Sequence, residues 1–124
     1  MARFRSCSRW IFCLATLVLV LGAAQVASAH AILVDSTPKA NSTVKGTELV
    51  VDLRYNVRVD GTRSKLVLVG PSGPATTLVI AKQSSPDHLQ SHATGLIPGT
   101  YKIQWYVLAS DGHMTHGEIP FTVS

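Results

Sequence analysis

The side chains best suited to holding a metal ion in this chain are its histidines and one nearby aspartate. The chain has five histidines, and all of them follow residue 29: His30, His88, His92, His113 and His116. The segment Asp111-Gly112-His113 places a carboxylate two residues from an imidazole, and Gly112 between them leaves the backbone free to turn. In an extended segment, residues two apart point to the same side, so the two side chains can converge on one ion. The same pattern is also common in hydrogen-bonded turns that bind nothing.

The first 29 residues have the organisation of a secretory signal peptide. Three arginines (Arg3, Arg5, Arg9) precede an apolar run over residues 10–21, and Ala27-Ser28-Ala29 forms an A-x-A cleavage site. A membrane-spanning helix needs about 20 apolar residues, so this run is short for an anchor, although an uncleaved anchor is the alternative. We therefore expect export to the periplasm, cleavage after Ala29 and a single domain over residues 30–124, with no membrane insertion after cleavage.

Cleavage after Ala29 would make His30 the first residue, with two ligands of its own. Its α-amino group and imidazole Nδ1 can close a chelate ring on one ion, and an α-amine, with a reference pKa of about 7.7–8.0, gives up its proton readily to a metal. Together with Asp111 and His113, this gives three nitrogens and one oxygen. Such a set in a plane suits Cu(II), whereas Zn(II) prefers a tetrahedron. Cu(I) favours sulfur, and Met114 is the sole sulfur donor after residue 29.

Charge and cysteine content exclude other classes of function. Three of the 11 Lys and Arg residues lie in the first 29 residues, so the remaining ones nearly balance the 7 acidic residues. No basic patch remains to indicate nucleic-acid binding. Cys7 and Cys13 also fall before residue 30, so the exported domain has no disulfide and no thiolate for a zinc or blue-copper site.

The other histidines and the large aromatic residues have less specific roles. His116 lies three residues after His113 and is a candidate weak ligand or hydrogen-bond partner of a metal-bound imidazole. His88 and His92 occupy a polar stretch and are interpreted as exposed loop or strand residues. Tyr101 and Trp105 are interpreted as core residues.

The segments that must position these residues are β-strands. Apolar and polar residues alternate, or apolar residues cluster, over residues 49–55, 65–69, 76–80, 101–107 and 119–123, and glycine and proline punctuate the chain between them. Several short strands in one small domain predict an all-β fold, an immunoglobulin-like antiparallel β-sandwich, with a Greek-key barrel as the alternative. Tyr101, after Pro98-Gly99, stands where such sandwiches have a tyrosine corner.

Both ends of the exported part resemble one family, the CopC-type periplasmic copper-resistance proteins. Residues 30–38 read HAILVDSTP, similar to the family's H-A-x-L-x-x-S-x-P. Residues 99–105 (GTYKIQW) and 110–113 (SDGH) are similar to its G-T-Y-x-V-x-W and S-D-x-H, and residues 117–123 (GEIPFTV) to its G-x-x-x-F-x-V. The resemblance spans residues 30–124 and is weakest in the middle.

The resemblance implies an immunoglobulin-like fold that holds one Cu(II) at one end, with His30, Asp111 and His113 as its ligands. It also implies a CopD-type inner-membrane copper transport protein as partner. Some members have a Met-rich Cu(I) site, but residues 60–96 contain no methionine here, so we expect none. Some members place a glutamate near the Cu(II) ion where this chain reads Tyr55-Asn56-Val57, so a carboxylate ligand is not expected there.

Three functions follow from these observations. The first is a non-enzymatic copper carrier or buffer, serving copper resistance or copper import. The second is a metal-free immunoglobulin-like interaction domain, because a fold alone does not fix a function. The third is a His-brace copper monooxygenase of the kind that oxidises polysaccharides, which the short chain, the few aromatic residues and Asp111 disfavour.

Overall fold

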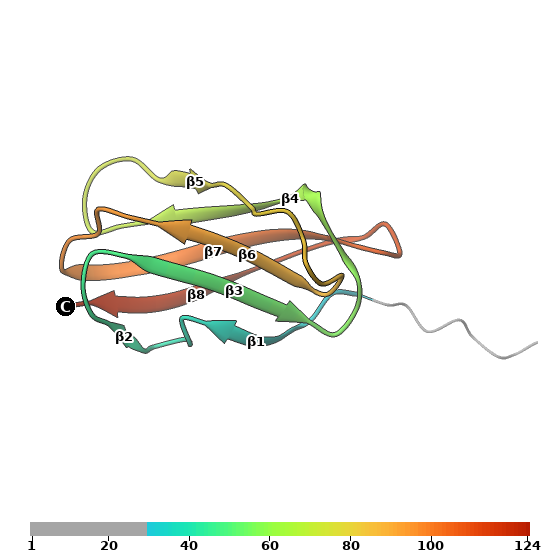
Figure 1. The fold of residues 1–124 in the computed structure, drawn as a ribbon, viewed down its shortest axis with the longest axis horizontal. Coiled ribbons are helices and arrows are strands. Elements are labelled where there is room, and N and C mark those ends of the chain that lie inside the picture. The colour runs from blue at the N-terminus through green and yellow to red at the C-terminus, as the bar shows by residue number, and fades with distance from the viewer. Residues whose placement is uncertain (1–29) are drawn as a thin grey trace, which may run out of the picture.

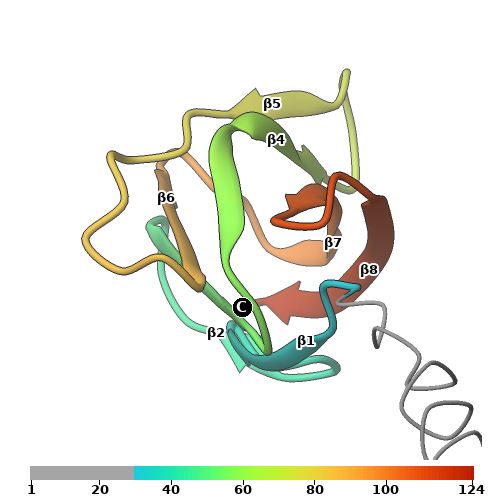
Figure 2. The same cartoon turned by 90° about the vertical axis from the view of Figure 1, so that its right-hand side faces the viewer.

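The computed structural model describes residues 30–124, which form eight strands in two packed sheets (Figure 1). The strands are β1 (Leu33–Thr37), β2 (Thr43–Val44), β3 (Leu49–Tyr55), β4 (Val59–Val69), β5 (Thr76–Leu78), β6 (His88–Ala93), β7 (Gly99–Ala109) and β8 (Met114–Val123). One sheet has the order β1-β3-β6 and the other β2-β8-β7-β4-β5. Viewed from one end, the strands of both sheets surround a common core (Figure 2). The predicted β-sandwich is confirmed.

The core follows from strict alternation along the central strands. On β3, Leu49, Val51, Leu53 and Tyr55 are buried while their neighbours point outward. On β7, the buried set is Tyr101, Ile103, Trp105, Val107 and Ala109. Side chains two apart on a strand share a face, so each sheet presents one apolar face, and burying both faces against each other holds the sandwich together. Tyr101 and Trp105 are core residues, as predicted.

The strands differ from prediction mainly in extent. The strand over residues 49–55 was predicted with its observed bounds, but β7 and β8 are longer because they pair with each other from Gly99↔Val123 to Leu108↔Met114. Strands β1, β2 and β6 were not predicted, since each is short or has few large apolar residues on its buried face. The two-residue pairing of β2 with β8 is parallel, so the larger sheet is not purely antiparallel.

Two features of β7 fix its ends. The Tyr101 hydroxyl donates a hydrogen bond to the Ile97 carbonyl and accepts one from the Ile97 N–H, each at 3.0 Å, so the predicted tyrosine corner is present. At its other end, β7 runs into the hairpin turn to β8, which lies at the same end of the sandwich as the start of the coloured chain (Figure 1). Residues 30–124 include no helix long and apolar enough to cross a membrane. The predicted signal peptide, residues 1–29, lies outside the described residues.

Candidate metal centre

The β7–β8 turn carries two of the predicted metal ligands. The Ala109 carbonyl accepts a hydrogen bond from Gly112 N–H at 3.0 Å, and Ala109 N–H donates one to the His113 carbonyl at 2.9 Å. Gly112 has a φ of 84°, the left-handed conformation that glycine adopts without steric cost. The Asp111 carboxylate closes the turn by accepting the His113 N–H through Oδ1 at 3.0 Å. Asp111 and His113 therefore converge through the turn that Gly112 was predicted to allow, whereas the prediction of an extended segment was wrong.

A second segment brings His30 to the same place. The Ala31 side chain is only 3% exposed and packs into the core. Its carbonyl accepts a hydrogen bond from the Thr115 hydroxyl at 3.0 Å. The next residue, Ile32, donates its N–H to Asn56 Oδ1 at 2.7 Å, and its carbonyl accepts the Asn56 N–H at 3.1 Å. These contacts fix the backbone directly after His30, so that His30 lies beside the turn.

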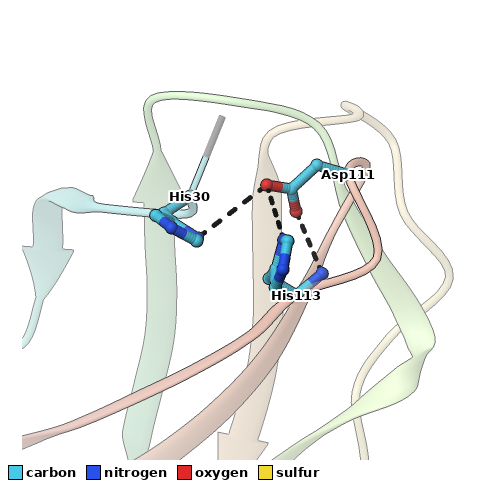
Figure 3. Close-up of side chains that lie close together, drawn as sticks. All are labelled: His30, Asp111 and His113. Carbon is cyan, nitrogen blue, oxygen red and sulfur yellow. Dashed lines mark hydrogen bonds and ion pairs between the residues drawn. The ribbon is translucent and has the colours of Figure 1, made fainter. Parts of the chain in front are cut away.

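The three side chains face one another in a compact triad (Figure 3). The Oδ2 atom of Asp111 lies 3.1 Å from Nδ1 of His113 and 3.8 Å from Nδ1 of His30. The two imidazole rings are edge to face, with centroids 4.9 Å apart. One potential ligand atom from each residue lies within 4.8 Å of the others. Small side-chain rotations would therefore suffice to place all three around one ion, since metal–ligand distances are about 2.0–2.2 Å.

The Asp111 carboxylate is held ionised. The His113 N–H that it accepts has the largest effect and lowers its pKa from the ordinary value. Desolvation is the second largest effect and raises the pKa, whereas the imidazoles of His113 and His30 lower it further, so the net shift is downward. Its side chain is 20% exposed, compared with 51% for His30 and 63% for His113. The triad therefore presents an anionic oxygen between two imidazoles that remain open to solvent, an arrangement able to take up a divalent cation directly from solution.

The remaining predicted candidates lie elsewhere. His116 points outward from β8 with its ring 6.1 Å from that of Tyr106, and it is not in the triad. His92 is exposed on β6, as predicted. His88, also on β6, is more buried than predicted: its side chain is 28% exposed, and its Nδ1 lies 2.9 Å from Asp52 Oδ1.

Thr115 and Asn56 have roles that the sequence did not indicate. Thr115 faces inward from β8 to the Ala31 carbonyl, and Asn56 holds both backbone groups of Ile32. Asn56 had been noted only for lacking a carboxylate, and its amide oxygen is used to position the chain. The strand alternation that turns Thr115 inward was the one available signal, but nothing in the sequence identified the carbonyl it would meet.

Comparison with known proteins finds one family. The CopC domain model matches residues 33–124. The copper resistance protein C of Escherichia coli is 31% identical over 114 residues, covering 85% of this chain and 90% of that protein. Protein YobA of Escherichia coli K12 is 33% identical over 98 residues, covering 77% of this chain and 79% of that protein.

Solved structures agree with the sequence relatives. The crystal structure of CopC from Methylosinus trichosporium OB3b superposes with a TM-score of 0.71 at 31% identity, over 77% of this chain and 94% of that one. PcoC, described as a methionine-rich copper resistance protein from Escherichia coli, superposes with a TM-score of 0.60 at 27% identity, over 77% of this chain and all of PcoC (100%).

Proposed function

The chain belongs to the CopC family, and on that premise we propose that it is a periplasmic copper carrier or buffer that binds one Cu(II) ion through His30, Asp111 and His113. The observation that supports this most directly is the triad itself. Two segments from opposite ends of the domain bring two imidazoles and a carboxylate within 4.8 Å of one another.

The donor set is the reason for choosing Cu(II). With His30 as the first residue, its amine and imidazole, the His113 imidazole and one Asp111 oxygen supply three nitrogens and one oxygen. Cu(II) favours tetragonal coordination by such N and O ligands. The described part of the chain offers no thiolate, and its one thioether, on Met114, is not in the triad. A CopD-type inner-membrane protein is the proposed recipient or source of the ion, in copper resistance or in copper import.

Asp111 favours the role of a copper carrier over that of an enzyme. A carboxylate between the two imidazoles supplies negative charge that stabilises Cu(II) relative to Cu(I). The open imidazole edges also allow the ion to exchange with a partner. A copper monooxygenase needs a reducible ion with an open coordination position, and the carboxylate opposes both requirements.

Electron paramagnetic resonance of the processed protein tests this proposal. Cu(II) is titrated into protein that begins at His30, and into a variant with one additional glycine before His30. We expect a one-to-one tetragonal signal with nitrogen and oxygen ligands in the first protein, and its loss or a change of ligands in the second. Asp111→Asn should weaken Cu(II) binding at least tenfold. His92→Gln is the matched control, because it removes an exposed imidazole from the other sheet. Identical signals from the native and glycine-extended proteins would refute the His30 site.

A further inference from the structure

Two side chains of types that can bind a metal, separate from the triad, lie on the outer face of β8. Met114 and His116 are two residues apart, so they share a face of the strand, and both are exposed, Met114 by 53%. Thr115 between them points the opposite way, toward the Ala31 carbonyl. Across the sheet, Met114 pairs with Leu108 and His116 with Tyr106. The pair is therefore presented on the solvent side of the five-stranded sheet.

We propose that Met114 and His116 form a separate binding site for Cu(I). A thioether is a soft ligand that selects Cu(I), and an imidazole also suits copper. Residues two apart on a strand are separated by about 6.6–6.8 Å. Metal–ligand bonds of about 2.0–2.3 Å require the sulfur and the nitrogen to approach within about 4 Å. Both side chains are long enough to lean toward each other across that gap, and both are unobstructed by the core.

The His116 imidazole lies beside the aromatic ring of its partner on the neighbouring strand, Tyr106. The His116 ring lies 6.1 Å from the Tyr106 ring at an interplanar angle of 33°, so the imidazole is kept over the β7–β8 surface. Met114 stands one residue from His113, and the proposed Cu(I) site therefore adjoins the triad without sharing a donor with it. The two sets differ in chemical hardness: nitrogen and oxygen in the triad, sulfur and nitrogen in the pair. The triad would bind Cu(II) and the pair would bind Cu(I), so the two sites would not compete for the same ion.

The methionine content makes the test specific. The chain has two methionines, Met1 and Met114, so the processed protein has a single methionine methyl group. Protein labelled with ¹³C at that methyl is titrated with Ag(I), a redox-inert substitute for Cu(I), and then with Cu(I) under nitrogen. We expect the Met114 methyl and the His116 ring resonances to shift together and to saturate at one equivalent.

Variants separate this site from the triad. His116→Gln should weaken Ag(I) binding at the Met114 methyl at least tenfold, whereas His92→Gln should not alter it. Asp111→Asn should leave the Ag(I) titration as in the native protein, so failure of the proposed Cu(II) site would not affect this result. An unmoved Met114 methyl would overturn the proposal. An equal shift of that methyl in His116→Gln would overturn it as well, since His116 would then not be a ligand.

Discussion

Replacing Thr115 by valine tests whether the segment before β1 is what places His30 in the triad. Valine keeps the branched shape of threonine but removes the hydroxyl that donates to the Ala31 carbonyl at 3.0 Å. One hydrogen bond contributes about 0.5–1.5 kcal/mol to stability, so the metal-free variant should lose about that much. For a domain of this size, 1 kcal/mol corresponds to a decrease in Tm of about 4–8 °C.

The same substitution should weaken Cu(II) binding by more than an ordinary surface change. The ordering of the Ala31 peptide that the hydrogen bond supplied must then be supplied when the ion binds, at a cost of up to the same amount, about 0.5–1.5 kcal/mol. Since 1.4 kcal/mol corresponds to a factor of ten, the affinity for Cu(II) should fall about 2- to 13-fold. Competition with a chelator of known affinity measures this. Thr122→Val is the matched control, because Thr122 lies on the same strand and is exposed. Thr115→Val with lowered Tm and native Cu(II) affinity would refute the reasoning.

Three further results are expected. Gly117→Ala should destabilise the fold by about 1–3 kcal/mol, because a Cβ there would lie 2.7 Å from Trp105 Cε2. Urea unfolding measures this loss, and a variant with native stability would contradict the prediction. Cu(II) at 100 times its dissociation constant should stabilise the processed protein by about 2.7 kcal/mol, seen as a rise in Tm that the glycine-extended variant lacks. The Asp111 carboxylate of the metal-free protein should titrate below the range of an ordinary aspartate, because the hydrogen bond from the His113 N–H lowers its pKa; ¹³C NMR of the carboxylate measures this, and titration in the ordinary range would disprove it.

The sequence predicted the fold wherever apolar alternation was complete. The strand over residues 49–55 has four buried apolar side chains in register, and its bounds were predicted correctly. Strand β6 was missed because its inward positions are Leu89 and the small polar Ser91, whose hydroxyl donates to the Val79 carbonyl at 2.7 Å. A pattern of hydrophobicity does not reveal a buried hydroxyl that is satisfied by a distant carbonyl.

The residues of the candidate site were predictable from the sequence, but the contacts that position them were not. His30, Asp111 and His113 were identified from residue type and spacing, and the structure brings them together. Their convergence depends on contacts between segments far apart in the chain, such as Ile32 with Asn56 and Ala31 with Thr115. Threonine and asparagine are common in strands and loops, so their types alone did not mark them as positioning residues.

The C-terminus lies at the end of the sandwich opposite the triad (Figure 1). Ser124 is tied there, donating its N–H to the Val44 carbonyl at 2.9 Å and accepting the Gly46 N–H at 3.2 Å. A molecule attached to a surface or a fusion partner through this end would therefore hold the His30, Asp111 and His113 triad outward. A dense layer of such molecules would have a common orientation, with every triad facing the solution and none buried against the support.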